Sequence, residues 1–389
     1  ALKEKDSTAT VWDALYNKKK TVIVQTAPAV RAALGEVFGY EPGTLVTGKM
    51  ASALHELGFD YVFDTNFAAD LTIMEEGSEF LERVQNAFTA PERKAVLPMI
   101  TSCSPGWIKF MEHRYPEQLA HLSSCKSPHM MLGALTKTYF AEKMNIDPAS
   151  IYMVSVMPCT AKKFEITRPE MFNHGLADVD AVITTRELGR MIKDAGIDFK
   201  NLPDGQFDSP LGLSSGAADI FGTTGGVMEA ALRTVYELVT GRELPGNNLH
   251  IAPLEGLDRI KTADVKIENP LEEFSYLNGV TVKVAVTSGL KGAAMLLDEI
   301  KNGTSPYHFI EIMGCPGGCI SGGGQPRPVN DEIRTKRLKA IYREDEGKPV
   351  RKSHENQDIM MLYNDFLGAP LGHKSHELLH TIYTKRSRN

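Results

Sequence analysis

Short apolar runs rich in β-branched residues alternate along this chain with longer segments of helical periodicity. Runs of this kind, bounded by glycine, proline, serine or threonine, are typical of strands. The predicted strands are Thr21–Gln25, Tyr61–Asp64, Ala95–Ile100, Ile151–Val156, Ala181–Thr184, Val280–Val286 and His308–Ile312. Apolar spacing of three and four predicts helices over Leu71–Phe88, with Asp70 as N-cap, and over Pro128–Met144 and Gly226–Thr240. This alternation predicts an α/β fold of mostly parallel sheets flanked by helices.

The order of these elements predicts two lobes, each with a mostly parallel twisted sheet. The first three strands are assigned to a first lobe, residues 21–150, and the last four to a second, residues 151–328. Residues 1–20 form an N-terminal segment. Residues 329–389 are predicted to be a helical region that wraps around the lobes, because the strand pattern stops and charged residues and histidine increase there.

The turns after the strands predict where a ligand binds. Parallel sheets gather their ligands at the carboxyl ends of the strands. The turns at Ala27-Pro28, Ser102-Cys103, Pro158-Cys159 and Gly314-Cys315 all follow predicted strands. One site between the two lobes is therefore expected to receive all of them.

Composition narrows the class of protein. The chain has 389 residues, a formal net charge of −6 and a pI of about 6.0, which disfavour nucleic acid or an anionic membrane as the main partner. Its apolar runs are far shorter than the roughly 20 residues of a spanning helix, and the N-terminus has no apolar signal core, so we expect a soluble, cytoplasmic protein. Three local basic clusters are either solvated faces or docking patches for an acidic protein: 18–20, 336–339 and 385–388.

The strongest local signal is a glycine-rich turn with two cysteines, Glu311–Pro326. Five cysteines are an odd number and a low density, which indicates reduced thiols. Cys315 and Cys319 can point both sulfurs at one metal centre, while glycine lets backbone amides approach the sulfides of a cluster. A structural zinc site needs a second close pair of ligands, whereas Cys159 is a single thiol beside two lysines. The set favours an iron–sulfur cluster, although each cysteine alone is more typical of a small buried hydrophobe.

Three segments resemble, in order, the signature segments of the [FeFe]-hydrogenases: Thr101–Trp107, Met157–Glu165 and Glu311–Pro326. The similarity extends from about Thr21 to Thr384. The chain therefore resembles the catalytic domain of enzymes that interconvert protons plus electrons and molecular hydrogen, with a small-subunit-like region at residues 329–389. The resemblance implies an H-cluster, which is a [4Fe–4S] cubane joined to a two-iron unit that carries CO, cyanide and a bridging azadithiolate.

The resemblance also assigns roles to single positions around this cofactor. Cys159, Cys315 and Cys319 match cubane ligands, and Cys319 also matches the bridge to the two-iron unit. The residues that match contacts of the two-iron unit are Lys162, for a cyanide, the thioethers Met157 and Met313, and the loop Ala27, Pro28 and Ala29. Without the resemblance, either methionine would be taken as core packing.

A buried centre of this kind needs a chain of titratable groups for protons. Glu76, Glu79 and Arg83 lie three and four apart on one stripe of the predicted helix. They match the relay residues of the family, as does Ser123, and Cys103 matches the thiol nearest the distal iron. Taken alone, Glu79 and Arg83 would be interpreted as a surface ion pair.

Two positions depart from the family pattern. Ser104 stands where the family has the fourth cubane cysteine, and a serine oxygen is a harder donor that suits an iron–sulfur cube poorly. Either the cubane or its turnover is compromised, or Cys103 is the ligand and the relay is broken. His129 stands where many relatives carry glutamine near the two-iron unit, so it either tunes that site or adds a titrating group. The remaining Cys125 is expected to be buried and structural.

Partners and competing functions complete these expectations. The chain has no Cys-x-x-Cys-x-x-Cys run of an upstream ferredoxin-like module, so we expect a ferredoxin-like carrier to supply electrons directly to the cubane. We also expect maturation proteins for the two-iron unit and a monomer, and no nucleic acid or membrane. The alternatives are a non-catalytic relative that resembles eukaryotic iron–sulfur assembly proteins and binds only a cubane, or a hydrogen sensor. Lys162, Met157 and Met313 favour the hydrogenase.

Overall fold

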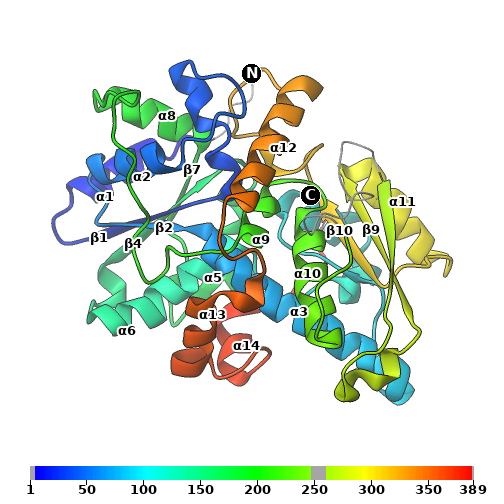
Figure 1. Ribbon diagram of the computed structural model, residues 1–389. Helices are drawn as coiled ribbons and strands as arrows, with labels where there is room; N and C mark the ends of the chain where they lie inside the picture. The colour runs from blue at the N-terminus through cyan, green and yellow to red at the C-terminus, as the bar shows by residue number, and fades with distance from the viewer. Residues whose placement is uncertain (1–4, 247–259, 388–389) are drawn as a thin grey trace.

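The computed structural model describes residues 5–246 and 260–387, in which two four-stranded sheets lie on opposite sides of a group of helices (Figure 1). The predicted α/β fold class with mostly parallel sheets is confirmed. No helix of the described ranges is both long and apolar enough to cross a membrane.

The first sheet has the order β2-β1-β4-β7, and all its strands are parallel. Its strands are β1 (Thr21–Thr26), β2 (Tyr61–Asp64), β4 (Ile151–Met157) and β7 (Ala181–Thr184). They are buried nearly end to end, as expected for a parallel sheet covered on both faces. In Figure 1 helices cover it above and below: α1 (Thr8–Tyr16), α2 (Thr47–Glu56) and α8 (Thr185–Asp194), then α5 (Pro128–Leu135) and α6 (Ala141–Met144).

The second sheet has the order β3-β10-β9-β8. Its parallel strands are β3 (Met99–Ile100), β10 (Phe309–Met313) and β9 (Thr281–Ser288), and β8 (Ile260–Lys266) pairs antiparallel with β9 at the edge. Two helices pack beside this sheet, α4 (Pro105–Arg114) and α11 (Leu290–Lys301).

The expected distribution of strands between the lobes is wrong. Strands β4 and β7 pair with β1, and β3 joins β10 in the second sheet, so the sheets do not divide at residue 150. Periodicity shows that a strand exists, but a crossover helix lets the chain pass to either sheet before the next strand. The strand expected over Ala95–Ile100 is reduced to β3, because Pro98 cannot donate to the ladder.

Two helices lie between the sheets, α3 (Thr65–Thr89) and α10 (Gly226–Thr240) (Figure 1). The predicted N-cap Asp70 is wrong, since the helix begins six residues earlier, where Asp64 accepts a hydrogen bond from the Asn66 backbone at 3.1 Å. Asp70 is instead buried within the helix. The single helix expected over Pro128–Met144 is interrupted by a π-helical turn between α5 and α6.

The C-terminal region is helical, as predicted. Its helices are α12 (Asp331–Glu346), α13 (Gln357–Leu362) and α14 (His373–Leu379), and they run across the helices that separate the sheets (Figure 1). In the basic cluster at 336–339, Lys336 and Lys339 are exposed, but Arg337 is fully buried and bonds the Glu36 carboxylate at 2.7 Å, so Arg337 belongs to neither a solvated face nor a docking patch. Arg388, from another basic cluster, lies outside the described residues.

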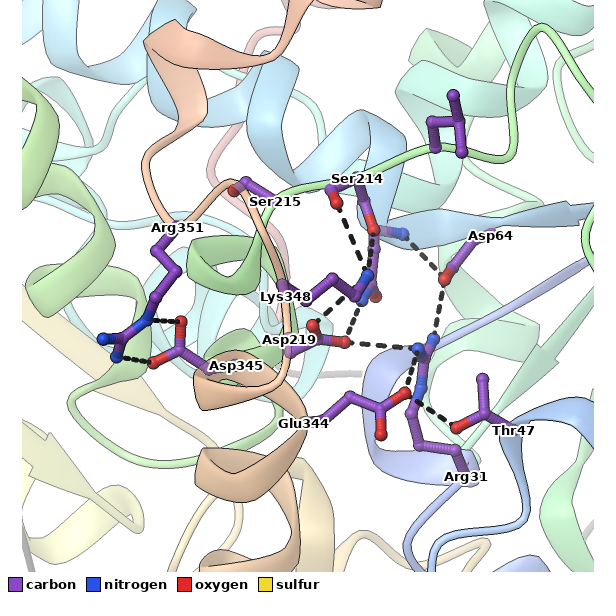
Figure 2. Close-up of polar contacts among 12 residues, drawn as sticks. Arg31, Thr47, Asp64, Ser214, Ser215, Asp219, Glu344, Asp345, Lys348 and Arg351 are labelled. Atoms are coloured by element: carbon purple, nitrogen blue, oxygen red, sulfur yellow. Dashed lines mark hydrogen bonds and ion pairs between the residues drawn. The ribbon is translucent and has the colours of Figure 1, made fainter.

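A buried ionic cluster around Arg31 connects these parts (Figure 2). The Arg31 guanidinium has no exposed surface, and it bonds both oxygens of Asp64 at 2.8 and 2.9 Å. It also lies 3.2 Å from Asp219 and 3.5 Å from Glu344. Lys348 adds a second cation, 3.4 Å from Asp219. Removing a buried cation with this set of partners strongly destabilises the folded protein, because each carboxylate that loses its partner stays desolvated.

We predict that Arg31→Met lowers the free energy of unfolding by about 3–5 kcal/mol, because it removes the buried cation that pairs with Asp64 and leaves Asp219 with Lys348 alone. Denaturant unfolding measures the change. The matched control is Arg190→Met, which breaks an exposed ion pair with Asp6 and should cost less than about 1 kcal/mol. Equal losses in the two variants would contradict this role of Arg31.

Candidate active site

A cavity lies where the carboxyl ends of strands from both sheets meet. The turn after β1 contributes Ala27 and Pro28, and β10 contributes Met313. The predicted site residues that line it are Ala27, Pro28, Cys103, His129, Met157, Cys159, Lys162, Met313 and Cys319. Residues that are far apart in the sequence thus meet at one site, as the strand ends predicted.

The thiols gather at one side of this cavity. Cys159 follows β4, Cys315 follows β10, and Cys319 begins the next short helical turn. Burial raises the pKa of Cys319, and the nearby thiols Cys159, Cys103 and Cys315 raise it further. All these cysteines are free, so they form a convergent set of sulfur donors.

The glycines around Cys319 let the turn pack directly against other backbone segments. Gly318 has φ +92°, and a Cβ there would lie 2.7 Å from the backbone of Thr223 and Thr224. A Cβ on Gly322 would lie 2.2 Å from the Pro158 carbonyl oxygen. These contacts are with protein backbone, so Gly322 lets the turn of Cys319 pack against the turn of Cys159, and Gly318 lets it pack against Thr223 and Thr224.

Lys162 and His129 share one buried carboxylate. Glu165 lies 2.7 Å from the Lys162 ammonium and 2.7 Å from His129 Nε2, and His129 Nδ1 lies 3.2 Å from the Ser155 hydroxyl. Burial alone would raise the pKa of Glu165, but Lys162 and His129 outweigh it and lower that pKa to about 2. Burial and the Lys162 charge lower the pKa of His129. The site therefore contains a fixed ammonium–carboxylate pair, with a neutral imidazole beside it at neutral pH.

The adjacent residues Cys103 and Ser104 point to different surroundings. Cys103 lines the cavity, and its backbone carbonyl accepts a hydrogen bond from the Lys162 ammonium at 2.9 Å. The Ser104 hydroxyl does not line the cavity; it accepts a hydrogen bond from the Gly314 amide at 3.1 Å. Ser104 therefore lies against the residue that precedes Cys315.

Two further predicted contacts lie just outside the cavity lining. Cys315 is close enough to Cys159 for the two thiols to interact electrostatically. The carbonyl of Ala29 accepts a hydrogen bond from the Gln325 amide at 2.9 Å, and its side chain packs in the core between the sheets.

The predicted relay residues form a connected chain on α3. Arg83 bonds the Glu79 carboxylate at 2.6 Å, the Ser123 hydroxyl donates to Glu79 at 3.0 Å, and Ser123 also hydrogen-bonds Glu76. Burial raises the pKa of Glu76 to about 8, and repulsion by Glu79 adds to the shift. Burial likewise raises the pKa of Cys103 to about 12. The chain thus runs from the partly exposed Arg83 to Glu76, which is close enough to Cys103 on the cavity wall for its charge to act on that thiol.

Comparison with known proteins identifies the family. Residues 20–323 match the iron-only hydrogenase large subunit, C-terminal domain, and residues 331–386 match the iron hydrogenase small subunit. The chain belongs to the [FeFe]-hydrogenase family. It is 54% identical over its whole length to the NADP-reducing hydrogenase subunit HndD of Solidesulfovibrio fructosivorans, of which it spans 64%. The fold matches a single-residue variant of [FeFe]-hydrogenase HydA1 of Chlamydomonas reinhardtii with a TM-score of 0.88 and 44% identity, covering 98% of this chain and 100% of that one.

A more distant relative comes from another class. The cytosolic Fe-S cluster assembly factor narfl of Danio rerio is 30% identical and aligns with 94% of this chain and 87% of its own length.

Several residues of the [FeFe]-hydrogenase site were not among the predicted site residues. Phe221 and Thr65 line the cavity, and Glu165 organises Lys162 and His129. The signal for Glu165 was present in the sequence, because it stands three residues after Lys162 in the same signature segment. Cys125 is fully buried, as predicted.

Proposed function

We propose that this chain catalyses the reversible reaction 2H⁺ + 2e⁻ ⇌ H₂ at an H-cluster. The observation that carries the proposal is the cavity between the two sheets, which combines free thiols, a buried ammonium and two thioethers in a member of the [FeFe]-hydrogenase family. The bound cofactor would supply the redox chemistry and the hydrogen-binding metal.

The donors of the cavity fit such a cofactor. We assign Cys159, Cys315 and Cys319 as ligands of the cubane, because their free thiols converge and thiolate is the usual donor to iron–sulfur clusters. The ammonium of Lys162, held in place by Glu165, is suited to stabilise an anionic ligand in a dry pocket. Around it, Met157, Met313 and the loop at Ala27, Pro28 and Ala29 would enclose the two-iron unit in apolar surface.

Protons would travel along α3. Glu76 has a pKa of about 8, so it gains and loses a proton near neutral pH, as an intermediate carrier must. Ser123 connects it to Glu79, and Cys103 would pass the proton between Glu76 and the cofactor. We interpret Arg83 as the group that holds the Glu79 carboxylate at the outer end.

Partners follow from this assignment. An H-cluster needs dedicated assembly, and stepwise H-cluster assembly is revealed in the structure of HydA(deltaEFG), which is 44% identical to this chain. A maturation system is therefore part of the proposal. The ferredoxin-like electron donor, the monomeric state and the cytoplasmic location stay predictions.

A cubane-only function is the second candidate, favoured by the similarity to an assembly factor and by Ser104 at the position of the fourth ligand. The much higher identity to a hydrogenase subunit and the presence of Lys162 in the cavity favour the hydrogenase.

We predict that Glu79→Gln lowers hydrogen turnover of the matured protein by about 100-fold or more, because the amide keeps the volume of the carboxylate and one acceptor oxygen but cannot carry a proton. The infrared spectrum of the cofactor should persist. Glu82→Gln, an exposed change on the same helix, is the control and should leave turnover unaltered. Near-normal turnover in Glu79→Gln would remove this residue from the path.

We predict that Ser104→Cys raises both the iron content per chain and hydrogen turnover, since its side chain lies beside Gly314 and Cys315 and a thiolate there completes a four-sulfur set. Iron analysis and cubane spectroscopy measure the first effect. The companion variant Cys103→Ala should keep the cubane but stop turnover. Unchanged iron and turnover in Ser104→Cys would contradict the assignment, and loss of the cubane in Cys103→Ala would identify Cys103 as the ligand.

A further inference from the structure

The Glu79 carboxylate has a second hydrogen-bonded neighbour that the relay does not use. The Ser124 amide donates to its two oxygens at 3.0 and 3.2 Å, and the Ser124 hydroxyl lies 3.2 Å from Oε2. Ser123 approaches the same carboxylate from the side of Glu76. Glu79 is therefore a branch point with two serine hydroxyls.

The second branch continues into the C-terminal region. The Ser124 hydroxyl lies 2.8 Å from Nδ1 of His380, and Nε2 of His380 lies 3.1 Å from the Glu75 carboxylate. The backbone holds the imidazole in this place, because the Thr381 amide donates to the Ser124 carbonyl at 2.7 Å and the Lys126 amide to that of Leu379 at 2.8 Å.

His380 lies among acidic side chains. Glu75 and Glu79 face it from α3, Cys125 lies beside it, and Tyr363 donates to Glu75 at 2.6 Å. Burial would raise the pKa of Glu75, but the hydrogen bonds from His380 and Tyr363 outweigh it and lower that pKa, so Glu75 is ionised at neutral pH.

The branch also reaches the surface. His380 itself is 8% exposed, and its ring packs against exposed His376, with the two ring planes tilted by 44° and 4.3 Å between the ring centroids. At the other branch, the Arg83 guanidinium stays protonated at every accessible pH, so it cannot release the proton it carries. An imidazole titrates near neutral pH and has one nitrogen to accept a proton and another to release it.

We propose that His380 is a second proton entrance, which exchanges protons between solvent on the α14 side and Glu79 through the hydroxyl of Ser124. This inference rests on the proposed hydrogenase function. In the inward direction the ring starts as the tautomer with its proton on Nδ1: Nε2 accepts a proton from the Glu75 carboxyl, which returns to its ionised form, Nδ1 gives its proton to the Ser124 oxygen, and the Ser124 hydroxyl proton passes to Glu79. Each N–H or O–H bond that breaks is matched by one that forms, and the outward direction reverses the sequence. His380 acts through Glu79 and does not touch the cofactor.

The first test uses the matured enzyme and the pH profile of hydrogen turnover. His380→Gln keeps hydrogen bonds to Ser124 and Glu75 but does not titrate, so turnover should fall by about 10-fold, with infrared spectrum and iron content unchanged. Added imidazole should restore turnover in His380→Ala. His373→Gln, an exposed change on α14, is the control. A His380→Gln profile that equals the control, or a His380→Ala loss that imidazole does not rescue, would overturn the proposal.

A second measurement separates this inference from the proposed function. In protein with ¹⁵N-labelled histidine, the His380 ring, assigned by its loss in His380→Gln, should titrate, and Glu79→Gln should move its midpoint to lower pH because a neighbouring negative charge is removed. Absence of hydrogen turnover in the unsubstituted enzyme would reject the proposed function, and this titration would still decide the branch. If the ring keeps one protonation state, or if its titration midpoint does not change in Glu79→Gln, His380 is not coupled to the relay.

Discussion

One buried cation, Arg31, holds together the segments that enclose the candidate active site. It directly follows the loop that lines the cavity, and its carboxylate partners come from three separate parts of the chain (Figure 2). Asp64 ends β2 and caps α3, Asp219 precedes the turn that brings Phe221 to the cavity, and Glu344 belongs to α12. Because a carboxylate in the interior is destabilising without a cation, the loop, the start of α3, the segment that contains Asp219 and the C-terminal region must take one arrangement together.

Two buried glutamates near the cavity have opposite protonation states and different proposed roles. On one side, Glu165 pairs with Lys162 and holds its ammonium beside the cavity, which suits the binding of an anion. On the other, Glu76 is buried among carboxylates and is protonated at neutral pH, which suits proton transfer. The same physical effect, desolvation, acts on both glutamates, and the presence or absence of a close cation determines the outcome. The ion pair proposed to bind an anion and the glutamate proposed to carry protons therefore lie on different helices.

The sequence was sufficient for features that depend on local pattern. Strands such as β2 and β7, helix α10 and the convergence of Cys159 with Cys319 followed from periodicity, turn residues and resemblance. Sheet membership did not follow, because β3 finds its partner β10 across more than half of the chain and no local pattern encodes that pairing.

Side-chain contacts between residues far apart in the chain could not be predicted from the sequence either. Asp70 has the residue type of an N-cap, yet it is buried and accepts hydrogen bonds from Ser215, which is distant in sequence. The link between His380 and Ser124 likewise requires the C-terminal region to fold back onto the segment before α5.

The central claim is that this cavity holds a complete H-cluster and not a cubane alone. An infrared spectrum of the protein, after maturation with the dedicated assembly proteins, tests it most directly. The account predicts absorption bands from both CO and cyanide, accompanied by hydrogen evolution from a chemical reductant. Cubane absorbance without CO or cyanide bands would contradict it and would place the chain functionally with the assembly-factor relatives.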